Sequence, residues 1–118
     1  MIVCEIGLNH DGDSIYADEY LDVLLKYDID ALTFQVREQD FYKHKKKSGL
    51  LLTKNYYSQA KRKVAGANKK FGVALSDLTL LEFFESIDTD FYKILSKDAN
   101  DIKYINKFMM GTNKNIFS

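Results

Sequence analysis

Residues 2–27 read IVCEIGLNHDGDSIYADEYLDVLLKY and contain the pattern of a strand, a turn and a helix in succession. The apolar run IVCEI ends at Gly7, which is typical of a short buried strand. The polar letters NHDGD then predict a turn, and Asp13 or Ser14 is placed to cap a helix that extends to about Tyr27. Aromatic and apolar residues recur in this helix at spacings of three and four, which predicts one buried face.

The same alternation of short apolar runs and longer amphipathic stretches continues along the chain. Such a pattern is typical of repeated βα units around a parallel sheet. Further strands are expected at residues 31–36, 71–75, 91–95 and 115–117. Further helices are expected at residues 55–68, after a cap at Thr79, and from Asn100 or Asp101 to a left-handed terminator at Gly111. We expect residues 37–54 to form a loop.

The expected strands are apolar on both faces, as in sheets with helices on one side and a filled barrel interior on the other. The chain holds about four and a half βα units, and an eight-unit barrel needs about 250 residues. The sequence therefore predicts an α/β fold that is the first half of a (β/α)8 TIM barrel. Residues 1–118 would be a partial catalytic domain, truncated at the start of its fifth strand. A complete open sheet of the flavodoxin type is the competing architecture.

Composition limits the classes of partner and compartment. Lys plus Arg number 17 and Asp plus Glu number 17, so net charge gives no reason to expect nucleic acid or an anionic membrane. The only cysteine, Cys4, lies in an apolar run, which predicts a buried, inert thiol in a reducing compartment. The sequence has no signal-peptide pattern and no apolar run near the roughly 20 residues that span a bilayer. We expect a soluble, cytoplasmic protein whose basic run, Lys43–Lys47, is a solvated loop.

Polar residues gather inside the expected strands or directly after them. In a parallel βα barrel, ligands bind at the carboxyl ends of the strands and in the loops that follow. All four complete strands contribute to this rim, with Glu5, Asn9, His10, Gln35, Arg37, Ser76, Asp77, Lys93, Ser96, Lys97 and Asp98. These residues are therefore the candidates for a functional site.

A carboxylate or an ammonium inside an apolar strand is costly unless it is paired or bound to a ligand. Glu5 and Lys93 could pair with each other across the barrel interior. Alternatively, Lys93 and Ser96 suit a phosphate or carboxylate ligand, because they supply a charge and a hydroxyl donor. With one Cys and two His, the chain alone is not expected to form a zinc site, and a polar turn explains His10 and its acidic neighbours equally well.

Four blocks of sequence resemble the sialic acid synthase (N-acetylneuraminate synthase) family. Residues 4–13, CEIGLNHDGD, are similar to the family's E-I-G-x-N-H-N-G-D and form the most specific block. Residues 91–98, FYKILSKD, resemble its Y-K-I-A-S-G-[DE]. Residues 33–35, TFQ, resemble its K-F-Q, and residues 114–118, KNIFS, resemble the start of its K-P-V-I-L-S-T-G strand. Order and intervals also fit, so the resemblance covers essentially the whole chain and implies the N-terminal half of the catalytic barrel.

The resemblance implies a phosphoenolpyruvate-dependent transferase of carbohydrate biosynthesis that forms a carbon–carbon bond. Its substrates would be phosphoenolpyruvate and an N-acyl hexosamine, either N-acetylmannosamine or its 6-phosphate, and its product a nonulosonic acid. Carbon 3 of phosphoenolpyruvate attacks the sugar aldehyde, water adds at carbon 2, and phosphate leaves. The resemblance also implies a divalent metal, Mn or Mg, with ligands outside this chain, and a homodimeric full-length parent. The 118 residues alone are expected to be inactive.

Site roles follow from the same resemblance, position by position. The catalytic residues would be Asp98, as a proton-transfer group, and Glu5. Lys93 and Ser96 would bind phosphoenolpyruvate, and Glu5 and Gln35 would orient the sugar. The rim-loop residues would be Asn9, His10 and Asp77.

Three positions depart from the family pattern. Thr33 replaces a lysine that helps bind phosphoenolpyruvate, and Lys97 replaces the glycine between Ser96 and Asp98. Residues 73–77 read VALSD where the family often reads S-T-P-F-D. These differences motivate an alternative, a non-catalytic half-barrel that serves as a binding or assembly module. Another phosphoenolpyruvate-using barrel of the aldolase type, with a different acceptor, is a third hypothesis.

Overall fold

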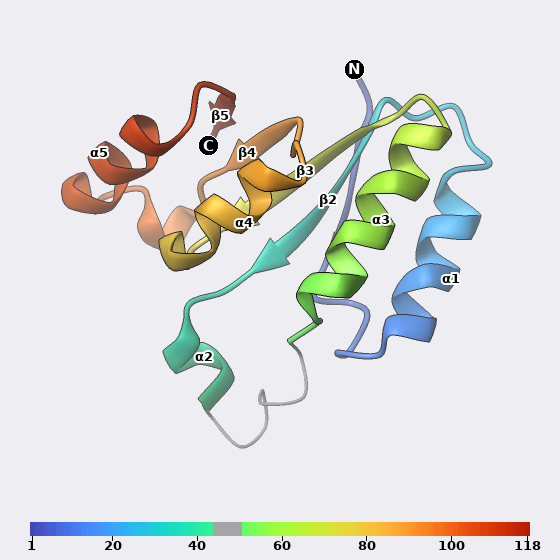
Figure 1. The fold of residues 1–118 in the computed structure, drawn as a ribbon, viewed down its shortest axis with the longest axis horizontal. Coiled ribbons are helices and arrows are strands. Elements are labelled where there is room, and N and C mark those ends of the chain that lie inside the picture. Colours follow the sequence, from blue (N-terminus) through green and yellow to red (C-terminus); the bar gives the residue numbers. More distant parts are fainter. Residues whose placement is uncertain (44–50) are drawn as a thin grey trace.

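The computed structural model describes residues 1–43 and 51–118, which form a five-stranded parallel sheet with helices packed along one face (Figure 1). The strands are β1 (Val3–Gly7), β2 (Ala31–Val36), β3 (Lys70–Leu75), β4 (Phe91–Lys93) and β5 (Asn115–Phe117). The helices are α1 (Ser14–Leu24), α2 (Gln39–Lys43), α3 (Lys54–Gly66), α4 (Leu81–Ser86) and α5 (Ile102–Gly111). Short 3-10 turns, η2 (Leu78–Leu80) and η3 (Ser96–Asp98), follow β3 and β4.

The order of the strands decides between the two architectures expected from the sequence. The sheet runs β1-β2-β3-β4-β5, and each strand pairs in parallel with the next one along the chain. A flavodoxin-type sheet has the order 2-1-3-4-5 and helices on both faces. The flavodoxin alternative is therefore wrong, and the chain consists of successive βα units wound in one direction.

Side-chain caps explain where the helices begin. Asp13 caps α1 by accepting hydrogen bonds from the backbone N–H groups of Ile15 and Tyr16, as the sequence predicts. Asp101 caps α5 in the same way. The expected cap at Thr79 is wrong, because Asp77 is the cap of η2, and its carboxylate accepts from both the N–H and the hydroxyl of Thr79.

The loop expected at residues 37–54 contains a short helix, α2. Its position depends on Tyr42, which is buried and whose hydroxyl accepts a hydrogen bond of 2.9 Å from the backbone N–H of Arg37. This hydrogen bond holds α2 against the end of β2. The local sequence pattern does not predict it. Residues 44–50, which include most of the basic run expected to be a solvated loop, lie outside the described residues.

Gly111 is the last residue of α5 and is not the left-handed terminator expected from the sequence. The described glycines with positive φ are Gly7 and Gly12. A Cβ atom at Gly111 would lie 2.4 Å from Cδ2 of Leu81. The glycine therefore permits the close approach of α5 to α4 and does not reverse the chain direction.

The hydrophobic core lies between the sheet and the helices. Alternate residues of the strands face it, including Leu32, Phe34, Val36, Phe71, Val73, Leu75 and Tyr92. The helices contribute Ala17, Leu21, Tyr57, Ala60, Val64, Phe84 and Phe108. Cys4 packs against this core and is half-buried, so the expectation of a buried thiol is confirmed only in part.

The opposite face of the sheet, here called the inner face, carries the intervening residues of the strands. Its members include Val3, Glu5, Thr33, Gln35, Gly72, Ala74, Phe91, Lys93 and Phe117. The rings of Phe91 and Phe117 are 5.8 Å apart, and together with Met1, Val3 and Lys93 they line a concavity of about 180 Å³. This face therefore combines apolar rings with a few charged groups.

Gly72 makes room for the ring of Phe91 on the inner face, and this contact leads to a stability prediction. A Cβ atom at Gly72 would lie 2.4 Å from the ring. We expect Gly72→Ala to lower the free energy of unfolding by about 1–3 kcal/mol through overpacking. In a Phe91→Ala background the sign should reverse, because glycine in a strand costs about 0.5–1 kcal/mol relative to alanine. Urea denaturation of the four proteins measures this coupling, and equal effects of Gly72→Ala in both backgrounds would contradict it.

Candidate functional site

Glu5 on β1 and Lys93 on β4 meet across the inner face. Their Oε2 and Nζ atoms are 3.5 Å apart, although β2 and β3 lie between the two strands. Three steps across a flat sheet would separate the backbones by about 14 Å, so long side chains must reach toward each other. The intervening Gly72 and Ala74 are small enough to leave this path clear. The pairing considered from the sequence therefore forms.

The ion pair between Glu5 and Lys93 is still open to solvent. The two side chains are 44% and 30% exposed, respectively. Because exposed pairs are weak, an anionic ligand of modest affinity can compete with Glu5 for the ammonium. The ion pair with Glu5 therefore does not prevent Lys93 from binding an anionic ligand.

Gly7 brings Gln35 beside the same pair. Its φ of 62° and the register shift between Glu5 and Gly7 mark a local irregularity in β1. A Cβ atom there would lie 3.8 Å from Cγ of Glu5 and 3.9 Å from Oε1 of Gln35. Both side chains thus flank the bare backbone of Gly7, so the structure groups Glu5, Gln35 and Lys93 at one place.

A second polar cluster surrounds Asp98 at the ends of β2, β3 and β4. The hydroxyl of Ser76 donates a hydrogen bond of 2.8 Å to Oδ2 of Asp98. The ammonium of Lys97 donates to Oδ1 at 2.5 Å and lies 3.0 Å from Oε2 of Glu38. Both carboxylate oxygens of Asp98 therefore have donors, and Lys97 links the ends of two strands that are not neighbours.

Glu38 is a member of this cluster that the sequence analysis missed. Partial burial raises the pKa of its carboxyl, but hydrogen bonds from Arg37, its own backbone and Lys97 outweigh burial and lower the pKa to about 2. Arg37 also lies over the ring of Phe41, with its guanidinium carbon 4.1 Å from the ring centroid. The available signal was an acidic residue directly after Arg37, the arginine that follows β2.

The low pKa of Glu38 predicts how this contact responds to acid. The stabilisation is complete above the ordinary pKa of 4.5 and is lost as the pH falls through about 2. In an NMR titration we expect the Glu38 carboxyl to show a midpoint near 2, and Lys97→Met to raise that midpoint toward 4.5. A midpoint that Lys97→Met leaves unchanged would show that Lys97 does not bind this carboxylate in solution.

The expected rim-loop residues occupy three different environments. His10 follows β1 as expected, but its side chain is fully buried, with its ring centroid 6.1 Å from that of Phe34. Its Nδ1 accepts a hydrogen bond of 2.9 Å from the N–H of Gly12, and burial lowers its pKa while nearby Asp11 opposes this. Asn9 is exposed, and Asp77 is the cap described above. The His10 side chain is thus enclosed on the helix side of the loop.

Thr33 and Ser96 bear on the proposed binding of an anion. Thr33, at the position where the family pattern has a lysine, is fully buried, and its hydroxyl has no hydrogen-bond partner among the described residues. It cannot place a charge in the site. Ser96 begins η3, separated from the end of β4 by Ile94 and Leu95, and is exposed, so its hydroxyl is accessible to a ligand.

Within residues 1–43 and 51–118, no three or more His, Cys, Asp or Glu side chains converge to hold a metal ion. No helix in the same part of the chain is both long and apolar enough to cross a membrane.

Comparisons with known proteins give matches among solved structures only, because no family model and no curated protein sequence matches the chain. One similar structure is N-acetylneuraminic acid (sialic acid) synthetase from Leptospira borgpetersenii serovar Hardjo-bovis in complex with citrate. It aligns with 98% of this chain and 43% of its own, at a TM-score of 0.86 and 22% identity. Another is the putative spore coat polysaccharide biosynthesis protein E from Chromobacterium violaceum ATCC 12472. It aligns with 98% of this chain and 39% of its own, at a TM-score of 0.83 and 14% identity.

This chain therefore spans about two fifths of the length of the solved proteins that it matches, with 43% and 39% covered. At identities of 22% and 14%, the likeness is one of fold. It agrees with the resemblance found in the four sequence blocks, and it extends over nearly all of the chain. The chain has the α/β fold of the N-terminal part of a sialic acid synthase-like protein.

Proposed function

We propose that this chain is the first half of a (β/α)8 catalytic domain whose enzyme condenses phosphoenolpyruvate with an N-acyl hexosamine to give a nonulosonic acid. The observation that carries the proposal is the convergence of Glu5, Gln35 and Lys93 on the inner face of a synthetase-like fold. Sequential parallel strands with helices on one face support the barrel, because a closed barrel repeats this arrangement eight times.

Lys93 and Ser96 are proposed to bind phosphoenolpyruvate. The ammonium of Lys93 is a compact charge whose single ion-pair partner among the described residues, Glu5, is 3.5 Å away and exposed. A phosphate or carboxylate group of the substrate would bring a second anion to this ammonium. The exposed hydroxyl of Ser96 supplies a hydrogen-bond donor from the end of the same strand.

The reaction proposed for the complete enzyme forms a bond between carbon 3 of phosphoenolpyruvate and the aldehyde carbon of the sugar. The aldehyde oxygen becomes a hydroxyl, water adds at carbon 2, and phosphate leaves. Glu5 and Gln35 would orient the sugar, and Asp98 would transfer a proton. Because Ser76 and Lys97 occupy both oxygens of Asp98, this role requires Lys97 to move away during the cycle.

A divalent Mn or Mg ion, which the sequence resemblance implies, would supply Lewis acidity toward the aldehyde. The described residues do not form a site for it, so no step is assigned to the metal on this chain. We also propose that the full-length protein is a cytoplasmic homodimer, as the sequence resemblance implies.

A non-catalytic binding or assembly module is the second candidate. Two observations favour it: Thr33 is buried and uncharged at the position of a ligand-binding lysine, and Asp98 is held by two donors. A module of this kind would retain the fold and the ion pair between Glu5 and Lys93 without turnover.

An assay of the protein encoded by the full reading frame separates the two candidates. Phosphoenolpyruvate is supplied with N-acetylmannosamine or its 6-phosphate and with Mn or Mg, and released phosphate and nonulosonic acid are quantified. We expect Asp98→Asn to lower kcat by about 10²–10⁴-fold, as for loss of a proton-transfer group. Asp28→Asn, a charge change at an exposed position outside the site, should leave kcat unchanged. Folded protein that releases no phosphate with either acceptor would reject the synthase and favour the module.

A further inference from the structure

The side chain of His10 lies in the loop between β1 and α1, and the proposed synthase reaction assigns it no chemical step. The side chain is fully buried, and its ring packs beside that of Phe34. Its Nδ1 accepts a hydrogen bond of 2.9 Å from the backbone N–H of Gly12. An imidazole nitrogen that accepts a hydrogen bond carries no proton, so this contact requires the neutral form of His10 with its proton on Nε2.

The turn that this hydrogen bond closes has an unusual backbone conformation. Asp11 and Gly12 are consecutive residues with positive φ, at 55° and 75°. A non-glycine residue such as Asp11 adopts this conformation at a cost, so contacts around the turn must hold it. Backbone hydrogen bonds from the N–H of Asp11 to Leu8 and from the N–H of Asp13 to His10 contribute. The imidazole of His10 adds a side-chain contact that closes the turn.

Protonation of His10 would remove the contact that the neutral ring makes. The imidazolium has an N–H group on both nitrogens, so Nδ1 would face the N–H of Gly12 as a second donor. Nε2 is buried and has no hydrogen-bond partner within residues 1–43 and 51–118, so the charged ring gains no acceptor there. Because an unpaired buried charge is costly, the protonated ring would leave its pocket and the turn would open.

The groups nearest to His10 do not place a counter-ion inside the pocket. Burial of the imidazole lowers the pKa of His10, and the exposed Asp11 in the same loop opposes this without outweighing it. The carboxylate of Asp13 is engaged as the cap of α1. The neighbour from β2 is the uncharged ring of Phe34.

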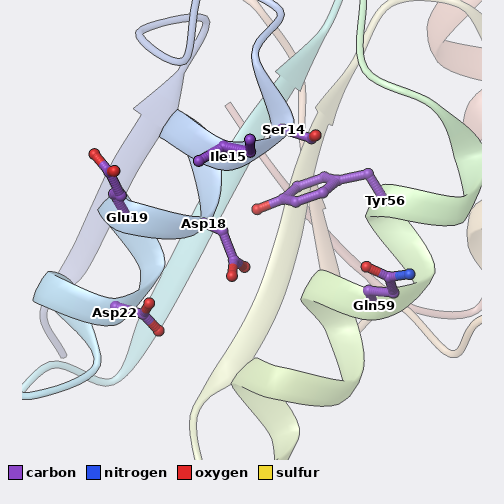
Figure 2. Close-up of a pocket in the computed structure, with 7 residues that line it drawn as sticks. All are labelled: Ser14, Ile15, Asp18, Glu19, Asp22, Tyr56 and Gln59. Carbon is purple, nitrogen blue, oxygen red and sulfur yellow. The ribbon is translucent and has the colours of Figure 1, made fainter.

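The charged and titratable side chains of α1 and α3 are engaged with one another or neutral. Burial raises the pKa of Tyr56 and of Tyr57, so both phenols of α3 are uncharged. Figure 2 shows the phenol of Tyr56 pointing toward Asp18 on α1 and Glu19 pointing away from it. Asp18 and Asp22 share the ammonium of Lys63, at 2.9 Å and 2.6 Å.

We propose that His10 is a proton-sensitive latch, in which the neutral imidazole holds the loop between β1 and α1 closed and protonation releases it. This loop carries Asn9 and follows Gly7, which lies beside Glu5 and Gln35. Release of the loop would therefore loosen the rim next to the candidate site. The latch does not depend on the proposed synthase reaction.

The direction of the pH dependence follows from the lowered pKa of His10. The stabilisation by the neutral ring is complete above the ordinary pKa of 6.5. It is lost as the pH falls from 6.5 through the lower pKa of the folded protein. The latch is therefore closed at neutral pH and opens in mild acid.

Two NMR measurements on the complete protein, from about pH 8 down to the acid limit of the folded state, test the latch. One follows the nitrogen shifts of the His10 imidazole. The other follows the protection of the Gly12 N–H, the ratio of its intrinsic to its measured hydrogen-exchange rate. We expect a His10 midpoint below 6.5 and a fall of about tenfold in Gly12 protection with the same midpoint, because one hydrogen bond is lost. The N–H of Tyr104, which Asp101 accepts, should keep its protection as His10 titrates.

Three variants sharpen the test. Asp11→Asn removes the charge that favours protonation, and asparagine tolerates positive φ, so this variant should fold normally and lower the His10 midpoint further. Asp28→Asn makes the same change at an exposed position outside the loop and should leave the midpoint unchanged. His10→Asn keeps an acceptor for the Gly12 N–H but has no titratable ring, so Gly12 protection should become independent of pH.

Three results would each overturn the latch. The first is a His10 midpoint at or above 6.5, which would mean that burial does not favour the neutral ring. The second is an imidazole that stays neutral as long as the protein is folded. The third is Gly12 protection that does not change as His10 titrates.

Discussion

Phe34→Ala is expected to lower the free energy of unfolding by about 3–5 kcal/mol, because it leaves a cavity in the core. Phe34 lies on β2 and is fully buried. Its ring is 5.8–6.2 Å from the rings of four neighbours, which are His10, Tyr56, Tyr57 and Phe71. These neighbours come from the loop after β1, from α3 and from β3. Removal of the Phe34 ring therefore removes packing contacts with three separate elements. Urea denaturation monitored by circular dichroism measures the change.

Tyr27→Ala is the control for this prediction, since it also removes an aromatic ring. Tyr27 is 64% exposed, and its substitution should change the free energy of unfolding by no more than about 0.5 kcal/mol. Similar losses for both variants would mean that Phe34 does not lie at the centre of the core. A small loss for Phe34→Ala alone would lead to the same conclusion.

Asp90→Ala should destabilise the fold by about 3 kcal/mol, because it leaves a mostly buried ammonium without its partner. Oδ2 of Asp90 accepts hydrogen bonds of 2.8 Å from both the backbone N–H of Phe71 and Nζ of Lys61. The side chains of Lys61 and Asp90 are only 13% and 20% exposed. The carboxylate therefore joins the start of β3, the start of β4 and α3, and the midpoint of urea denaturation should fall accordingly.

An exposed ion pair provides the comparison for Asp90. Lys114 and Asp88 are 2.7 Å apart, with side chains 37% and 78% exposed. Lys114→Met should shift the midpoint of urea denaturation far less than Asp90→Ala, because water and salt already screen this pair. Equal shifts of the midpoint in the two variants would contradict the view that burial makes the Asp90 contact more stabilising than an exposed ion pair.

Local sequence signals predicted the elements that depend on local interactions. The strand at residues 31–36 is confirmed at those bounds, because its alternate residues Leu32, Phe34 and Val36 are apolar and face the core. The caps at Asp13 and Asp101 are confirmed, since a cap needs only backbone N–H groups two or three residues away. The sequence signal for such a feature therefore lies within a few residues of the feature itself.

Features that depend on contacts distant in sequence were wrong or missed. The helix at Gln39–Lys43 was missed for another reason, because the hydrogen bond from the Arg37 N–H to the Tyr42 hydroxyl spans only five residues but follows no recognisable sequence pattern. Gly111 is explained only by the side chain of Leu81 on another helix. Glu38 joins the site through Lys97, which follows a strand that is not adjacent to β2 in the sheet. No pattern within one segment reports such contacts.

Calorimetric titration of the complete protein with phosphoenolpyruvate tests most directly whether the rim around Lys93 is an anion site. The account predicts saturable binding that Lys93→Met weakens by about 10–100-fold, because a hydrogen bond to a charged group is lost. Lys70→Met, which removes an exposed charge at the start of β3 and thus at the opposite end of the strands, should leave the affinity unchanged. Absence of saturable binding, or equal affinity in the unaltered protein and Lys93→Met, would contradict the proposed site.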